Sequence, residues 1–253
     1  MQSPDIRIVL VDPSHPGNIG ATARAMKNMA LGSLVLVRPK QFPHPEATAR
    51  ASGADDLLER ARVVDSVAEA IADCGFVAAT TSRDRDQNFR VADVRDAAER
   101  IVREARTSPA ALLFGAERTG LTNEDLESAH VLIRIPTSEA YTSLNLAMAV
   151  QLVSYELFRA TNPQVSGAAT PVRAPMQRDV PLATAEQMER LYAHLAEVLE
   201  QVDFRDRTQS GSHLMGRIRR FFQRAELDQN EANIVRGILT AVQSKRRHAG
   251  EGK

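Results

Sequence analysis

Short apolar runs alternate with longer amphipathic stretches over about the first 160 residues of the chain. Apolar runs bounded by turn residues predict buried strands, whereas apolar positions three or four residues apart predict helices packed on one face. The predicted strands lie near 7–12, 34–37, 75–81, 110–115 and 131–135, with 62–64 as a candidate short strand. The predicted helices lie near 19–31, 66–73, 93–105, 122–128 and 144–160. This order predicts an α/β fold built on a parallel sheet.

The pattern changes near residue 162. A stretch rich in Pro, Gly, Ser and Ala begins there, and Pro175 and Pro181 follow it, which is typical of a linker. Beyond it we find no convincing strand pattern, while 184–187 and 228–231 resemble capping boxes at the start of amphipathic helices. We therefore expect an α/β domain over 1–162, a linker over 163–183 and a small all-helical extension over 184–253.

The first candidate for chemistry is the loop that joins the first strand to the first helix. In a parallel sheet this loop lies at the carboxyl edge, where free backbone N–H groups and the helix dipole favour polar or anionic ligands. Asn18 is predicted to cap the helix, and Arg24 to project from its second turn. The simpler alternative is that Asn18 is only a cap and Arg24 only a solvated side chain.

Two further strand-to-loop transitions carry polar residues. The strand that ends at Phe114 leads into a loop in which Gly115 and Gly120 bracket Glu117, and these glycines allow close backbone approach. The strand over 131–135 leads into a polar loop and then a long helix that is predicted to begin near Ser143. All three loops are therefore expected at the same edge of the sheet.

The three segments together resemble the motifs of the TrmH-like class of SPOUT RNA methyltransferases. The first motif is Asn-Ile-Gly-Ala at 18–21 followed by Ala-Arg-Ala-Met-Lys-Asn at 23–28, and the others lie at 112–121 and 131–150. The resemblance implies a SPOUT methyltransferase domain with a deep C-terminal trefoil knot, which general fold rules would not propose. It also implies S-adenosylmethionine as cofactor and a twofold homodimer in which the first-motif arginine works beside the partner's cofactor.

The resemblance also assigns residues. Arg24 would activate the ribose hydroxyl, Asn18, Glu117 and Asn145 would orient it or the neighbouring backbone, and Ser143 would line the cofactor edge. The implied cofactor-binding set is Thr80, Thr81, Ser82, Gly115, Glu117, Gly120, Leu121, Ile135, Ser143 and Leu144. A guanidinium stays protonated in proteins, so we favour Arg24 as an electrostatic stabiliser of the developing alkoxide over Arg24 as a literal base.

Charge is balanced overall but uneven along the chain. Lys and Arg equal Asp and Glu at 32 each, yet from Arg173 onward 14 basic residues stand against 11 acidic ones. Arginines spaced along a helix neutralise phosphates, which predicts an RNA-binding surface. The candidate RNA-binding residues are Arg24, Arg118, Arg217, Arg219, Arg220 and Arg224. We interpret the interleaved Phe204, Phe221 and Phe222 as core residues.

The tail from 221 to 243 resembles the C-terminal extension of one branch of this class, the TrmJ-type tRNA ribose methyltransferases. That likeness implies tRNA as the partner and methylation of the ribose 2′-hydroxyl of nucleotide 32 in the anticodon loop, on cytidine or uridine, with a purine at this nucleotide left open. Close branches share these motifs but differ in target, so another ribose position in tRNA or ribosomal RNA stays open as an alternative.

Other classes of function are less well supported. No apolar run approaches the roughly 20 residues that cross a bilayer, and no signal peptide pattern is present, so we expect a cytoplasmic location. Cys74 is the only cysteine and is expected to be a buried, inert thiol, while six scattered histidines, His15 among them, predict no metal site.

Two rival interpretations remain. The chain can be a non-catalytic RNA-binding module, although Arg24, Glu117 and Asn145 are all intact. A dinucleotide-binding enzyme is the other rival, but Gly17 and Gly20 lack the Gly-x-Gly-x-x-Gly spacing, and Arg38 stands where an acidic residue is required.

Overall fold

The computed structural model describes residues 4–81, 89–162, 164, 180–204 and 214–250. Seven strands form one sheet in the order β3-β2-β1-β6-β4-β7-β5, and every neighbouring pair is parallel. The strands are β1 (Ile6–Val11), β2 (Ser33–Val37), β3 (Arg62–Val64), β4 (Phe76–Thr80), β5 (Val91–Asp93), β6 (Ala110–Phe114) and β7 (Val131–Arg134). The predicted α/β class and parallel sheet are confirmed.

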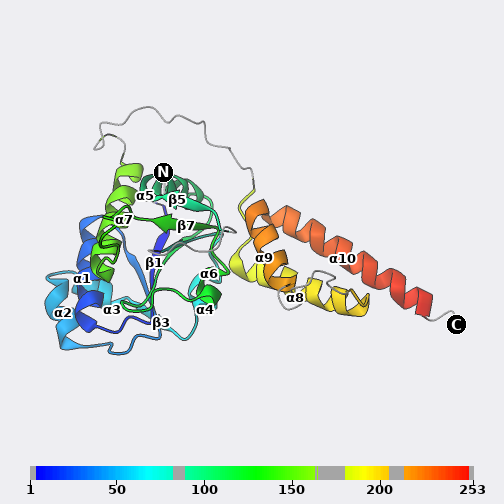
Figure 1. The fold of residues 1–253 in the computed structure, drawn as a ribbon, viewed down its shortest axis with the longest axis horizontal. Helices are drawn as coiled ribbons and strands as arrows, with labels where there is room; N and C mark the ends of the chain where they lie inside the picture. Colours follow the sequence, from blue (N-terminus) through cyan, green and yellow to red (C-terminus); the bar gives the residue numbers. More distant parts are fainter. Residues whose placement is uncertain (1–3, 82–88, 163, 165–179, 205–213, 251–253) are drawn as a thin grey trace.

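Helices cover both faces of this sheet. Those of the α/β domain are α1 (Pro16–Asn28), α2 (Pro45–Ala51), α3 (Asp55–Glu59), α4 (Val67–Ile71), α5 (Val94–Glu104), α6 (Asn123–Leu126) and α7 (Leu146–Thr161). Alternate residues of β1 divide the core, because Ile8 packs with α1, α5 and α7 whereas Val9 packs with α4 and α6. Figure 1 shows α1, α2 and α7 gathered on one side of the sheet.

The chain after the linker forms three helices beside the α/β domain. They are α8 (Ala185–Gln201), α9 (Leu214–Ala225) and α10 (Gln229–Gly250), and α10 runs away from the sheet toward the C-terminus (Figure 1). No strand occurs within 180–204 or 214–250, as the sequence predicted. Both capping boxes are confirmed, because Thr184 exchanges hydrogen bonds with Gln187, and Asp228 does so with Glu231.

Most predicted elements lie within two or three residues of their observed bounds, but three short ones were missed. These are α2, α3 and the edge strand β5, which have seven, five and three residues. Such short elements carry too few positions for a periodic pattern, and contacts with the rest of the fold fix them. The candidate short strand at 62–64 is confirmed as β3.

Two helices begin two or three residues from their predicted starts. The first helix begins at Pro16 rather than near residue 19, and the ring of His15, not Asn18, caps it by accepting the Gly17 N–H at 3.2 Å. Proline suits a first helical position because its missing N–H would have no helical partner there. The last helix of the α/β domain begins at Leu146, with Asn145 as its cap, so Ser143 lies in the preceding loop.

The structure tests the burial that the sequence predicted for one cysteine and three phenylalanines. Cys74 is fully buried, and this burial raises the pKa of its thiol to about 12, which confirms an inert cysteine. Phe222 packs against the core of the helical region as predicted. The prediction was wrong for Phe204 and Phe221, which are 54% and 58% exposed.

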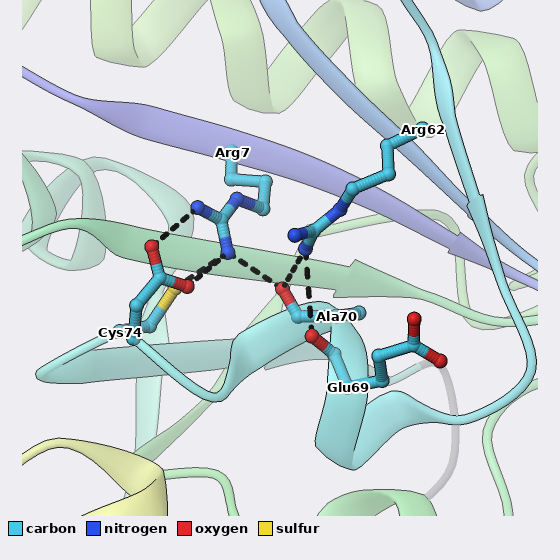
Figure 2. Close-up of polar contacts among 6 residues, drawn as sticks. Arg7, Arg62, Glu69, Ala70 and Cys74 are labelled. Atoms are coloured by element: carbon cyan, nitrogen blue, oxygen red, sulfur yellow. Dashed lines mark hydrogen bonds and ion pairs between the residues drawn. The ribbon is translucent and has the colours of Figure 1, made fainter.

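One charged side chain, that of Arg7, is buried on the face of the sheet that α4 covers. Arg7 projects from β1 on the same side as Val9, and Figure 2 shows it meeting the end of α4 together with Arg62 of β3. Its Nη1 donates to the Ala70 carbonyl at 2.6 Å, and its two terminal nitrogens pair with both oxygens of Asp73 at 2.7 and 2.9 Å. These bonds raise the pKa of Arg7 and fix the turn that joins α4 to β4.

Candidate active site

A cavity of about 760 Å³ opens where β4, β6 and β7 end. This size suits a nucleoside-sized ligand. Its lining contains nine of the ten residues predicted to hold the cofactor: Thr80, Thr81, Gly115, Glu117, Gly120, Leu121, Ile135, Ser143 and Leu144. The tenth, Ser82, lies outside the described residues. The second and third of the loops predicted from the sequence therefore meet at one edge of the sheet.

The two glycines of the second loop allow the backbone to fold back on itself. A Cβ at Gly115 would lie 2.2 Å from both the Gly120 carbonyl carbon and the Leu121 nitrogen, a distance that real side chains do not reach. Gly120 has a φ of 69°, in the left-handed region, and its N–H donates to the Ala116 carbonyl at 2.8 Å. The tight loop leaves room for a ligand beside the backbone.

Glu117 is the centre of the polar network at this edge. Its carboxylate accepts hydrogen bonds from the Ser14 N–H at 3.0 Å, the Ser14 hydroxyl at 2.8 Å, the His15 N–H at 3.2 Å and the Asn18 amide at 2.8 Å. Partial burial opposes ionisation, but the bonds from Asn18 and Ser14 outweigh it and lower the pKa of Glu117 to about 2. The group is therefore an anion at any physiological pH.

The network continues from Glu117 to the third loop. The Asn145 amide donates to the Asn18 side-chain oxygen at 2.9 Å, while the Asn145 oxygen caps α7 by accepting the Ala147 N–H at 3.0 Å. Asn18 is thus held from both sides, by Glu117 on the β6 loop and by Asn145 at the start of α7. Three of the five predicted catalytic residues are joined directly.

The other two are placed differently. Ser143 is exposed on the wall of the cavity. Arg24 is exposed on α1 and is not among the described residues that line the cavity of its own chain. The exposed Arg118, predicted to bind RNA, does stand on the cavity wall.

The four predicted RNA-binding arginines of α9 are not equivalent. Arg219 forms a bidentate ion pair with Glu189 of α8 and lies 4.5 Å from the centre of the Tyr192 ring. The pairing with Glu189 raises the pKa of Arg219 and fixes its side chain. Arg217 and Arg224 are exposed, and Arg220 is half-buried. Arg219 therefore also connects α9 to α8.

Two polar residues of the first loop were missed by the sequence analysis as parts of the network. Ser14 supplies two donors to Glu117, and the backbone of His15 supplies a third. The only signal for them was their position between the end of β1 and Asn18. That position does not show whether a loop serine bonds to another side chain or only to water.

Comparison with known proteins gives the same assignment for both regions. The model of the SpoU rRNA methylase family matches residues 5–155, and that of the C-terminal domain of the tRNA methyltransferase TrmJ matches residues 186–252. The tRNA (cytidine/uridine/adenosine-2′-O-)-methyltransferase TrmJ of Pseudomonas aeruginosa is 44% identical over 94% of this chain and 93% of its own length.

Two other relatives agree with this match. The tRNA (cytidine/uridine-2′-O-)-methyltransferase TrmJ of Yersinia enterocolitica is 40% identical over 98% of this chain and 95% of its own length. The crystal structure of TrmJ from Z. mobilis superposes with a TM-score of 0.78 at 34% identity, covering 94% of this chain and 98% of that one. Both regions of the chain thus have counterparts in one group of enzymes, and the chain belongs to the TrmJ branch of the SpoU methylase family.

Proposed function

We propose that this chain is a tRNA methyltransferase that transfers the methyl group of S-adenosylmethionine to the ribose 2′-oxygen of nucleotide 32, on cytidine or uridine. The relatives named above act on the 2′-oxygen of cytidine and uridine in tRNA. The observation that carries the proposal is the cavity beside the Glu117–Asn18–Asn145 network. It places a nucleoside-sized pocket next to a rigid set of polar groups.

The residues of the cavity fit S-adenosylmethionine. The close approach of Gly115 to Gly120 and Leu121 leaves backbone groups facing the cavity, and the volume of about 760 Å³ accommodates a nucleoside with an amino acid attached. We assign the binding of adenosine and methionine to the backbone at Thr80, Gly115, Gly120, Leu121, Ile135 and Leu144, with Thr81, Glu117 and Ser143 beside them. Ser82 keeps the same assignment from the resemblance and lies outside the described residues. The cofactor supplies a methyl group on a positively charged sulfur, which an oxygen nucleophile can displace in line.

Glu117 acts by position rather than by proton transfer. Its two carboxylate oxygens already accept four hydrogen bonds, and a carboxylate with a pKa of about 2 is too weak a base to remove a proton from a hydroxyl. Its role is to fix Asn18, which Asn145 holds from the other side. The amides of Asn18 and Asn145 then orient the ribose or its neighbouring phosphate.

Arg24 stabilises the charge that develops on the 2′-oxygen. A guanidinium remains protonated, so hydrogen bonds from Arg24 to the tRNA phosphate and the 2′-oxygen lower the pKa of that hydroxyl and set its direction, and the proton that the hydroxyl loses passes to solvent water. Arg24 is exposed on α1 and stands apart from the wall of its own cavity. This placement supports a homodimer in which Arg24 works at the partner's cavity.

The exposed face of α7 supports the same dimer. Met148, Leu152 and Tyr155 lie three or four residues apart on this helix and are 62%, 43% and 47% exposed. An exposed apolar stripe of this kind is typical of an isologous interface. We also propose the deep trefoil knot of the SPOUT class, for which the insertion of β6 between β1 and β4 and of β7 between β4 and β5 is suitable topology.

The two regions divide the work. Residues 1–162 form the catalytic domain, 163–183 the linker, and 184–253 an extension that binds tRNA through the arginines of α9. A cytoplasmic location is the corresponding prediction for an enzyme that acts on tRNA. Among the residues that the structure describes, no helix is long and apolar enough to cross a membrane.

The proposal is tested by transfer of labelled methyl groups to unmodified total tRNA, with the methylated nucleotide mapped, for the wild type and Arg24→Ala. We expect label on the ribose of nucleotide 32 with the wild type, and at least a 100-fold slower reaction with Arg24→Ala. Arg50→Ala, which removes another exposed arginine from the same domain, is the matched control.

Three outcomes would change the proposal. Label at another tRNA ribose would move the target, and transfer only to ribosomal RNA would move the substrate. Binding of tRNA without any transfer would replace the enzyme by an RNA-binding module.

A further inference from the structure

The helical region meets the α/β domain through an ion pair that is largely withdrawn from water. Arg100 of α5 contacts a carboxylate oxygen of Glu226, which stands in the turn between α9 and α10. The two side chains are only 13% and 12% exposed. Arg90, from the segment before β5, approaches the same carboxylate at 3.6 Å but is 65% exposed. Two cations of the α/β domain therefore face one anion of the helical region.

The surroundings of Arg100 fix its guanidinium. It lies over the Phe76 ring of β4, 4.7 Å from the ring centre, and its Nε is 4.0 Å from a carboxylate oxygen of Glu104. Its Nη1 has no hydrogen-bond acceptor within the described part of the chain. Glu226 is the nearer of the two carboxylates that compensate this guanidinium, and without it the buried charge is left with Glu104, which Arg103 shares.

The backbone at Glu226 does not by itself favour a glutamate. Glu226 has a φ of 53°, a left-handed conformation in which glycine or asparagine is more favourable. The Glu226 N–H donates to the Phe222 carbonyl at 3.0 Å and closes the last turn of α9, but this bond does not use the carboxylate. Its ion pair with Arg100 is the contact that accounts for a carboxylate at this position.

Backbone hydrogen bonds beside the ion pair also connect the helical region to the α/β domain. The strand-like segment before α8 pairs with the turn after Glu226, since the Ala183 N–H donates to the Leu227 carbonyl at 2.9 Å. Leu182 is 2% exposed and belongs to the core of the α/β domain. Through Ala183, the turn that carries Glu226 is thus connected to Leu182, which is buried in the core of the α/β domain.

The first turn of α8 also contacts the α/β domain, at the turn between α4 and β4. Its Ala185 and Glu186 N–H groups, which have no partner within their own helix, donate to the Cys74 and Ala72 carbonyls at 3.0 and 3.2 Å. These carbonyls belong to the turn that Arg7 holds through Ala70 and Asp73 (Figure 2). The acceptors for α8 therefore lie in a turn that contacts within the α/β domain also fix.

We propose that Arg100 and Glu226 are positioning residues: their ion pair fixes the helical region on the α/β domain of the same chain and so determines how tRNA is presented to the cavity. The inference rests on the proposed function, because it assigns tRNA contacts to α9. The extension is accordingly a rigidly docked part of the enzyme rather than a module on a free tether. Productive binding of tRNA requires α9 and the cavity to keep one relative orientation.

The test compares full-length Glu226→Gln and Arg100→Met, singly and together, with wild type. Small-angle X-ray scattering measures the docking, and methyl-transfer kinetics give KM for tRNA and kcat. We expect a larger radius of gyration and about a tenfold higher KM for tRNA with each single variant, at unchanged kcat and unchanged S-adenosylmethionine affinity. The double variant should be no worse than either single one, because the two side chains act through one contact.

Matched variants separate the ion pair from general damage. Glu200→Gln on α8 and Arg95→Met on α5 remove exposed side chains of the same types and should behave as wild type. Arg100→Lys keeps a positive charge and should restore most of the tRNA KM. Glu226→Asn also removes the carboxylate, and asparagine suits the left-handed backbone at this position. If another variant fails to fold, the same loss of docking in a folded Glu226→Asn protein still supports the proposal.

The proposal is overturned if Glu226→Gln and Glu226→Asn both scatter like wild type and keep its tRNA KM. It is also overturned if the effects of the two single variants add. A wild type that transfers no methyl group to tRNA would instead contradict the proposed function, and the scattering comparison would still decide whether the ion pair fixes the helical region.

Discussion

The cavity and the helical region use polar side chains in opposite ways. Around the cavity, one carboxylate accepts four hydrogen bonds, and Asn18 and Asn145 are held in a continuous network. On α9, whose residues are all described, no residue is buried, and Arg217 and Arg224 are exposed. The first arrangement suits a reaction that requires fixed geometry, and the second suits attraction to a phosphate backbone.

This contrast indicates that catalysis and RNA affinity are set by different residues. Changes at the cavity are expected to alter cofactor binding and turnover with little effect on tRNA affinity. Changes on exposed positions of α9 are expected to alter tRNA affinity and its dependence on salt. Arg219 belongs to neither group alone, because its pairing with Glu189 also packs α9 against α8.

The largest effect is expected from Gly115→Ala. The new methyl group would lie 2.2 Å from the Gly120 and Leu121 backbone, so the loop must move. We expect loss of S-adenosylmethionine binding by at least 100-fold and a destabilisation of about 1–3 kcal/mol. Calorimetric titration and thermal unfolding measure both. Gly32→Ala, at a position with nothing within 4 Å of the added atom, is the control, and equal behaviour of the two variants would contradict the role of the tight loop.

A second prediction concerns the Glu117–Asn18–Asn145 network, where a change is expected to leave the affinity for S-adenosylmethionine constant. Glu117→Gln replaces a fourfold acceptor by a group with one acceptor oxygen, so Asn18 and the Ser14 loop lose their fixed positions. We expect kcat to fall about 100-fold, since small misplacements have effects of this size. Single-turnover methyl transfer measures the loss, with Glu124→Gln, an exposed carboxylate on α6, as control. A kcat close to wild type would exclude Glu117 as a positioning residue.

The same carboxylate predicts how stability changes in acid. Its pKa is lowered from 4.5 to about 2 in the folded protein, so the folded state favours the ionised form. The stabilisation is fully present above about pH 4.5 and is lost as pH falls through about 2. Urea unfolding between pH 6 and pH 3 should show a steeper loss of stability for wild type than for Glu117→Gln. Parallel curves would show that the group is not stabilised as an anion.

The smallest effect is expected from α9. Replacing Arg217 and Arg224 together by glutamine removes two exposed cations and should weaken tRNA binding several-fold, while the slope of log affinity against log salt falls by about one to two. Filter binding across a salt series measures this. Arg60→Gln, an exposed arginine on the α/β domain, is the control. An unchanged slope would remove α9 from the RNA-binding surface.

Much of the α/β fold could be predicted from the sequence because its central strands are apolar runs buried on both faces, as in β6 and, apart from Arg7, in β1. The grouping of Glu117 with Asn18 was also accessible, since both follow strands of one parallel sheet. Ser14 and the cap at His15 were not, because their roles depend on distances between loops far apart in sequence. The Arg100–Glu226 pair was inaccessible for the same reason: neither residue stands in a motif.

The most direct test of the account is a crossed measurement on two variants, Gly115→Ala and the double variant Arg217→Gln/Arg224→Gln. Affinities for S-adenosylmethionine and for unmodified tRNA are measured on both, beside wild type. The account predicts that the first variant loses cofactor affinity and keeps tRNA affinity, whereas the second does the reverse. Loss of both affinities in both folded variants would contradict the separation of catalysis from RNA binding.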